Sequence, residues 1–211
     1  MTRIQTSTKA SAGVIALGLA LSIPAFAQLP GQKVPAGEIK SGAYTIDKTH
    51  AAINWHVNHL GFSTYQGRFE EFDAALNYNA DDPTESALSV TIPVENVDSG
   101  VAELDEHLQS DDFFNAAEYP EITFEATDIE ITGDGSGKIT GDLSMHGVTK
   151  PVTLDAELVG AGTHPVNEKY VVGFSGTTTI KRSEWGMDSY TPAVGDDITL
   201  EISAEFFHSG E

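Results

Sequence analysis

Polar and apolar residues alternate along most of the chain beyond residue 43. Ile53, Trp55 and Val57 fall on one side of a predicted strand, with other residues between them. Later segments repeat this period of two, which is the spacing of side chains on one face of a β-strand. We therefore expect antiparallel strands that each bury one face. The repeating positions are Leu88, Val90, Ile92 and Val94; Ile139, Leu143 and Met145; Val152, Leu154, Ala156 and Leu158; Val172, Phe174, Thr178 and Ile180; and Ile198, Leu200, Ile202, Ala204 and Phe206.

Glycine-containing stretches separate several of these segments and predict turns. They are GDGSG at residues 133–137, MHGV at 145–148 and VGAG at 159–162. Paired strands at such regular spacing favour a barrel or a sandwich over a βαβ fold. The alternation slips by one position within residues 68–72, which indicates a β-bulge there.

One segment has a helical pattern instead. Val101, Leu104 and Leu108 fall on one face of a helix, while acidic residues face away. We expect a short amphipathic helix near residues 99–109, with Asp98 or Ser99 as its N-cap. The sequence then continues through Phe113, Phe114 and Tyr119. These three aromatic residues are interpreted as a flap or plug that packs the excursion against the barrel.

The N-terminus has the pattern of an export signal. The first nine residues are polar and carry two cations, residues 10–23 are small and apolar, and Ala25 and Ala27 form an A-x-A cleavage pattern. This order is typical of a secretory signal peptide, and the apolar run is too short for a spanning helix. We expect a cleaved signal peptide at 1–27 and a periplasmic, soluble mature protein.

The remainder predicts one domain preceded by a linker. Residues 28–42 hold prolines, glycines and serine without periodicity, so we interpret them as an N-terminal linker or arm. Residues 43–208 are long enough to form a single domain with a core of its own. The chain has no cysteine, so neither disulfides nor thiolate chemistry can support it.

The net charge narrows the range of partners. The full chain has 11 basic and 32 acidic residues and a net charge of −21. Loss of Arg3 and Lys9 with the signal peptide leaves 9 basic residues and a net charge of −23. Such a surface repels phosphate backbones and anionic lipids, so we expect neither nucleic-acid binding nor stable membrane insertion. A homodimer stays open, although the sequence shows no clear apolar patch.

No recognised catalytic or metal-binding motif occurs in the sequence. His56 and His59 stand at an odd spacing, which places them on opposite faces of a strand, so we predict no metal site. His107 with Asp111 or Asp112 supports an alternative hypothesis, a hydrolase-type enzyme, but no nucleophile is evident beside them. A non-catalytic binding protein is therefore favoured.

An antiparallel barrel of about eight strands can hold one small ligand in its interior. The candidate contacts for an apolar ligand tail are aromatic or aliphatic residues on inward faces: Trp55, Val57, Phe124, Phe174 and Phe206. The same side chains could instead fill a closed core, which would make the protein an interaction module. Composition does not distinguish a cavity from a filled core.

Five motifs together resemble the YceI-like family of exported, lipocalin-like proteins. They occur in family order and cover roughly residues 43–207. The motifs are YTID at 44–47 with His50 and WHVNH at 55–59; DEHL at 105–108, SDDFF at 110–114 and YP at 119–120; GDLSMHGVTKPV at 141–152; Arg182 with WGM at 185–187; and VGD at 194–196.

The resemblance implies an all-β fold, an extended antiparallel lipocalin-like barrel that holds a long-chain isoprenoid or fatty amphiphile. It implies no resident cofactor, although an isoprenoid quinone or a polyprenyl lipid could be bound, for transport or storage. We expect the ligand's head group at the barrel mouth, near His59 or Arg182. Two positions depart from the family pattern: Ala51 replaces a serine and Leu104 replaces an arginine. Loss of that arginine favours a neutral head group over a pyrophosphate.

Overall fold

The computed structural model describes residues 31–210, and the predicted signal peptide at 1–27 lies outside the described residues. Within residues 31–210, ten strands form one antiparallel sheet. They are β1 (Gly42–His59), β2 (Ser63–Phe69), β3 (Asp73–Tyr78), β4 (Ala87–Pro93), β5 (Val97–Asp98), β6 (Glu121–Gly133), β7 (Ser136–Met145), β8 (Val148–Thr163), β9 (Tyr170–Lys181) and β10 (Val194–His208). Four short 3₁₀ turns are η1 (Ala36–Glu38), η2 (Pro83–Glu85), η3 (Val94–Asn96) and η4 (Arg182–Trp185).

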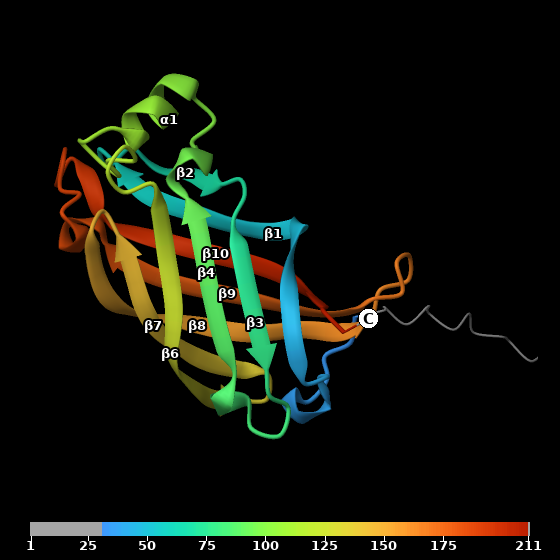
Figure 1. The fold of residues 1–211 in the computed structure, drawn as a ribbon. Helices are drawn as coiled ribbons and strands as arrows, with labels where there is room; N and C mark the ends of the chain where they lie inside the picture. The colour runs from blue at the N-terminus through green and yellow to red at the C-terminus, as the bar shows by residue number, and fades with distance from the viewer. Residues whose placement is uncertain (1–30, 211) are drawn as a thin grey trace, which may run out of the picture.

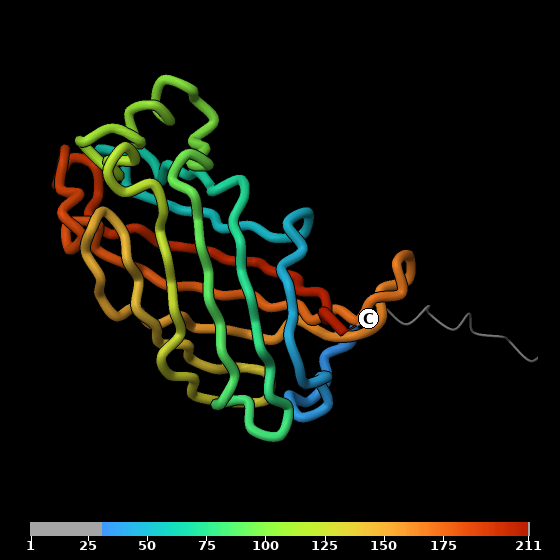
Figure 2. Tube along the Cα trace, in the orientation of Figure 1, coloured from blue at the N-terminus to red at the C-terminus, as the bar shows by residue number. Residues whose placement is uncertain are grey.

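The sheet closes on itself. Its order runs β10-β9-β8-β7-β6-β4-β3-β1, and β1 also pairs with β10. These eight strands form a complete ring, in which the first and last strands of the chain lie side by side (Figures 1 and 2). The predicted all-β barrel of about eight strands is therefore confirmed. β2 and β5 extend the sheet beyond the ring, beside the second half of β1.

Alternation of side chains explains why these segments are strands. In β3, Ala74, Leu76 and Tyr78 are buried, while the residues between them are exposed. A period of two places every second side chain inside the ring, where the side chain is removed from contact with water. The same rule buries Ile53, Trp55 and Val57 in β1, as the sequence predicts.

Two of the three predicted turns are observed. Gly133 pairs with Ser136 across the β6–β7 turn, and Met145 pairs with Val148 across the β7–β8 turn. At the β7–β8 turn, His146 and Gly147 have φ of 51° and 74°. Positive φ at both central residues is the geometry that two-residue hairpins prefer.

Two local predictions are wrong. β8 continues through residues 159–162, with a register shift between Leu158 and Gly160, and the chain turns only after Thr163. Glycine here allows an irregular strand and not a reversal. The slip at 68–72 is not a bulge, because β2 ends at Phe69 and β3 begins at Asp73.

The predicted helix is present but shorter. α1 spans Ala102–Gln109, and Val101 occupies the N-cap position without a side-chain cap. The prediction of Asp98 or Ser99 as N-cap is wrong; instead the Asp105 carboxylate accepts a hydrogen bond from the Ser99 backbone N–H at 2.6 Å. Within residues 31–210, no helix is long and apolar enough to cross a membrane.

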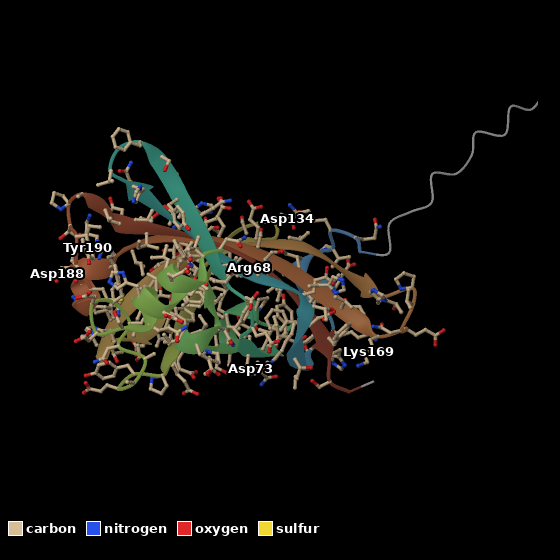
Figure 3. All side chains as sticks on the ribbon, turned by 90° about the horizontal axis from the view of Figure 1, so that it is seen from above. Arg68, Asp73, Asp134, Lys169, Asp188 and Tyr190 are labelled. Atoms are coloured by element: carbon tan, nitrogen blue, oxygen red, sulfur yellow. The ribbon has the colours of Figure 1, made fainter. Side chains whose placement is uncertain are left out.

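The barrel has two different ends. At the helix end, α1 and the loop at residues 186–193 lie over the ring (Figure 1). At the arm end lie the N-terminal arm (residues 31–41), the β3–β4 connection and the β6–β7 turn. Viewed from above, Tyr190 of the 186–193 loop and Lys169 beside β9 mark opposite sides of the molecule (Figure 3).

Close approach of two strands requires a glycine at position 141 in β7. A methyl group there would overlap the Phe124 ring and lie 2.6 Å from the Glu125 carbonyl oxygen. We expect Gly141→Ala to lower the free energy of unfolding by about 1–3 kcal/mol, because the overpacked strand must shift. Urea unfolding followed by circular dichroism measures this change.

Gly173→Ala in β9 is the matched control, because an added methyl group there meets its nearest atom at 3.8 Å. Its unfolding midpoint should stay close to that of the wild type. Equal effects of the two substitutions would contradict the steric explanation.

Candidate ligand-binding cavity

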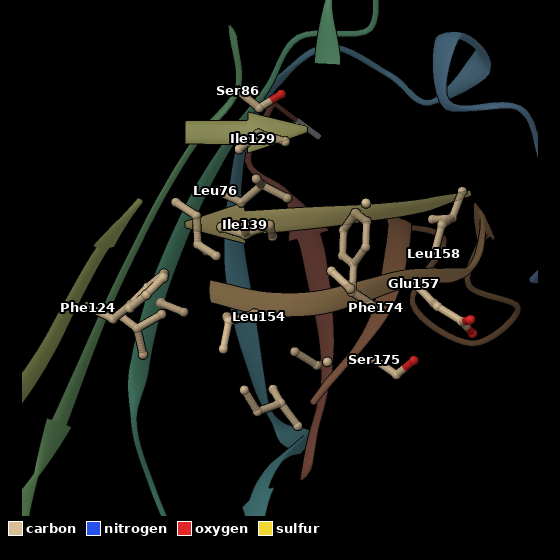
Figure 4. A pocket seen from close by; sticks show the side chains of 18 of the residues that line it. Leu76, Ser86, Phe124, Ile129, Ile139, Leu154, Glu157, Leu158, Phe174 and Ser175 are labelled. Atoms are coloured by element: carbon tan, nitrogen blue, oxygen red, sulfur yellow. The ribbon is translucent and has the colours of Figure 1, made fainter. Parts of the chain in front are cut away.

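An internal cavity of about 220 Å³ extends from the arm end into the barrel. A single water molecule needs only ~10–15 Å³ by the same kind of measure, so this space is not a packing defect. Strands from all around the ring contribute to its wall, and Figure 4 shows Phe124, Ile139, Leu154 and Phe174 converging on it. The interior of the barrel is therefore hollow toward the arm end.

The wall of the cavity is almost entirely apolar. Glu157 is the only charged side chain among the described residues that line it. Among the few polar neighbours, Ser86 lies in the connection before β4 and Ser136 at the start of β7, whereas Ser175 lies within β9. An apolar interior of this kind favours hydrocarbon over any charged group, since burial of an unpaired charge is costly.

Large buried side chains fill the helix end and close the cavity there. Trp185 is only 1% exposed, and its indole N–H donates to the Leu143 carbonyl at 3.2 Å. None of the side chains that fill this end lines the cavity. They are Phe69, Val94, Val97, Ile122, Met145, Trp185 and Met187.

The N-terminal arm closes part of the opposite end. Gln32 exchanges two backbone hydrogen bonds with Ala161 of β8, at 3.1 and 2.8 Å. The Tyr78 hydroxyl donates to the Ala36 carbonyl at 2.9 Å. Ala36 and Ile39 line the cavity directly, so the arm forms part of its mouth.

The predicted tail contacts divide into two groups. Phe124, Phe174 and Phe206 line the cavity, and the rings of Phe174 and Phe206 pack edge to face at 6.4 Å. Trp55 and Val57 are buried on the same face of β1 as Ile53, but they do not line the cavity. A ligand contact at any of the five stays a prediction.

The structure places neither predicted head-group residue beside the cavity. His59 is exposed at the end of β1, 6.3 Å from the Tyr65 ring between centroids. Arg182 is 4% exposed and donates to the carbonyls of Met187, Gly195, Ser189 and Val194 at 2.7–3.2 Å. Arg182 therefore orders the loop at the helix end.

The predicted plug lies over the filled helix end. Phe114 packs against Phe69 at 6.0 Å between centroids, and Phe113 stacks with Tyr190 at 6.0 Å. Tyr119 packs edge to face against His146 of the β7–β8 turn at 5.4 Å. The stretch thus covers large side chains and not the cavity, which opens at the other end.

The candidate catalytic pair lies at the helix end as well. His107 Nε2 is 3.0 Å from Asp112 Oδ2, and both side chains are substantially exposed. Asp111 is exposed, and the described structure has no hydrogen bond between its side chain and the His107 ring. The His107 ring instead contacts the aromatic rings of Phe113 and Tyr190. No hydroxyl group of the described residues hydrogen-bonds to this ring, so the geometry offers it no activated nucleophile.

Small residues to which the sequence analysis assigned no role create the open space. Ala156 of β8, Gly176 of β9 and Ala204 of β10 all line the cavity. Ala156 lies opposite Gly176 in the β8–β9 register, so two small residues meet on one part of the wall. They occupy inward positions of the alternating pattern, and their small size is the sequence feature that could have predicted the cavity.

A closed eight-stranded barrel around an apolar cavity has the architecture of a small-ligand binding protein. Residues 44–206 match the model of the YceI-like domain. A UPF0312 protein of Pseudomonas aeruginosa is 39% identical over 172 residues, which cover 81% of this chain and 89% of that protein. Protein YceI of Escherichia coli O157:H7 has the same identity and coverage. The chain therefore belongs to the YceI-like family, as its motifs predict.

Solved structures agree with the fold. The Campylobacter jejuni YCEI protein is 35% identical, with a TM-score of 0.64, over 72% of this chain and 89% of that one. A polyisoprenoid binding domain from Saccharophagus degradans is 13% identical, with a TM-score of 0.59, over 80% and 99%. At that identity, the second likeness concerns the fold alone.

Removal of the Arg182 guanidinium should strongly destabilise the barrel. Arg182→Met would leave several carbonyl groups at the helix end without their donor, and each such loss costs about 1–3 kcal/mol. We expect a total loss of at least ~3 kcal/mol in urea unfolding. Arg68→Met is the control, because Arg68 is 55% exposed and its ion pairs contribute at most about 1 kcal/mol. Equal losses for the two variants would contradict this role.

Asp196 should make stability at the helix end depend on pH. The backbone N–H of Ser183 donates to its carboxylate at 2.9 Å and is the main reason that its pKa lies below the usual 3.8. The folded state therefore favours the ionised carboxylate, and this contribution is present above the unfolded pKa. It is lost as the pH falls through the lower, folded pKa.

The difference in stability between the wild type and Asp196→Asn should consequently become smaller as the pH drops. Urea midpoints of both proteins between about pH 6 and pH 3 measure the gap, which should be constant above about pH 5. A gap that stays constant down to the lowest pH would refute the assignment.

Proposed function

We propose that this protein is a non-catalytic carrier that holds the isoprenoid tail or other long alkyl chain of an amphiphilic lipid inside its barrel. The observation that carries the proposal is the apolar cavity, which is open toward the arm end and blocked by large side chains at the helix end. Along most of its length, such a wall matches hydrocarbon better than any polar or charged group.

The energetics suit a slender chain. Burying about a dozen methylene groups contributes roughly 10 kcal/mol, from which association removes a large share. The cavity of about 220 Å³ is smaller than the roughly 300–1,000 Å³ typical of sites for drug-sized ligands. A single unbranched or prenyl chain therefore fits the proposal better than a bulky ring system.

The ligand is proposed to enter tail first through the arm end. Its tail would reach Phe124, Phe174 and Phe206, and its head group would stay near Ser86 and Ser136 at the mouth. No Lys, Arg or His of residues 31–210 lines the cavity. A neutral head group, such as that of a quinone or a fatty amide, is therefore favoured over a phosphate.

Two further considerations support the proposal. The Saccharophagus degradans protein that shares this fold is described as a polyisoprenoid binding domain. The sequence pattern of residues 1–27 predicts export, and a periplasmic protein that shields a lipid tail from water would serve transport or storage.

Native purification followed by solvent extraction and mass spectrometry tests this function. We expect close to one equivalent of a long-chain amphiphile per chain. Ala156→Phe, which places an aromatic ring on the cavity wall, should lower the bound amount at least tenfold. Thr177→Phe on the exposed face of β9 is the size-matched control and should retain the ligand.

Both variants must keep the wild-type circular dichroism spectrum for the comparison to count, and Ala156→Val offers a milder filling if the larger ring unfolds the barrel. Extracts that repeatedly contain no stoichiometric amphiphile, together with no binding of added prenyl quinones, would refute the proposal. Equal ligand content in Ala156→Phe and Thr177→Phe would place the ligand elsewhere.

A further inference from the structure

The pairing of β1 with β10 has two irregularities, and the larger one lies in the first half of β1. Ile46 pairs with Phe206, and the next paired residue of β1 is Ala51, opposite Ala204. Residues 47–50 of β1 therefore face Glu205 alone. Four residues against one make a large, irregular bulge, which turns side chains of β1 toward a single residue of its neighbour.

Three potential metal ligands meet at this bulge. Asp47, His50 and Glu205 each offer one donor atom, and the three atoms lie within 4.8 Å of one another. The closest pair is His50 Nδ1 and Asp47 Oδ2, which are 2.8 Å apart. Donors from two strands thus converge at a point that the regular ladder would not create.

The Asp47 carboxylate is held firmly in place. The residue is 9% exposed, and Thr49 donates to Asp47 Oδ1 from its backbone N–H at 3.0 Å and from its hydroxyl at 2.6 Å. These bonds leave Oδ2 directed at His50. Hydrogen bonds that orient a ligating carboxylate are characteristic of the surroundings of metal sites.

The local charge also favours a cation. The carboxylates of Asp47 and Glu205 both lie close to the His50 imidazole. The neighbouring Lys48 is paired with Asp73 at 2.7 Å. The nearest lysine in sequence is therefore engaged by another carboxylate, and not by the two that face His50.

We propose that Asp47, His50 and Glu205 form a binding site for a divalent transition-metal ion such as zinc. Zinc accepts one imidazole nitrogen and two carboxylate oxygens at roughly 2.0–2.2 Å, with water in the remaining position. The imidazole favours zinc, nickel or copper over magnesium or calcium. The exposed His50 side chain can make the small adjustment that ligation requires, and the ion replaces the proton that it shares with Asp47.

Such an ion would join the two strands that close the barrel. The paired residues on the β10 side of the bulge, Ala204 and Phe206, both line the cavity, whereas the three ligands do not. The metal site is therefore distinct from the lipid site, and its test is independent of the proposed function. Binding to the folded state alone would raise the melting temperature as the metal concentration increases.

Calorimetric titration of chelator-treated wild-type protein with zinc chloride tests the proposal. We expect one zinc ion per chain, with a higher melting temperature in its presence. Cobalt(II) should give a visible spectrum with the same stoichiometry. His50→Ala and Glu205→Gln should each weaken zinc binding at least tenfold, while both keep the wild-type circular dichroism spectrum.

His107→Ala is the matched control. His107 and Asp112 form a pair with similar geometry, at 3.0 Å, but they belong to no cluster of three donors in the described part of the chain. This variant should bind zinc as the wild type does. Absence of stoichiometric binding to the wild type, or a loss smaller than tenfold in either ligand variant, would overturn the proposal. Lipid content, measured separately, reports on the proposed function alone.

Discussion

The pairing of β1 with β10 is the constraint on which the remaining structure depends. Without it, the sheet would end in two long strands with unpaired backbone groups, which are prone to aggregation. With it, eight strands form a ring whose circumference fixes the interior width. β1 is long enough to serve twice: its first half pairs with β3 and its second half with β2, while β10 follows its other edge. Inward side chains then decide which part of that interior is solid and which is hollow.

The sizes of those side chains differ between the two ends. At the helix end, Trp185 and its large neighbours occupy the space, and Arg182 ties the covering loop to the strands through backbone carbonyls. Toward the arm end, Ala156 and Gly176 meet on the wall and leave room beside the aromatic rings. This difference in side-chain size produces a cavity because a closed sheet cannot collapse onto a gap as a looser core can. The filled region and the open region thereby occupy separate parts of one continuous core.

Sequence reasoning predicted the barrel well, because a period of two follows directly from strand geometry and recurs in every long segment. It located α1 to within three residues and two of three turns, but mistook the irregular Gly160 for a reversal. It did not find the bulge at residues 47–50, since bulges depend on how many residues the partner strand contributes. It tested His56 with His59 as a metal pair and named His50 only in a family motif, because Glu205, which lies beside His50, is distant in sequence. The filled and open ends depend on packing between distant strands, which no local pattern encodes.

The blocked helix end has a geometric consequence. If the proposed lipid chain enters from the arm end, it can advance only until it meets the Trp185 region, and any further length of the chain would remain outside the barrel. Chains that are too short would leave part of the cavity wall without contacts, whereas chains that are too long would expose hydrocarbon to water at the mouth. Selectivity among lipids would then depend on chain length as much as on chemistry. A larger or smaller side chain at the closed end would change the length that fits.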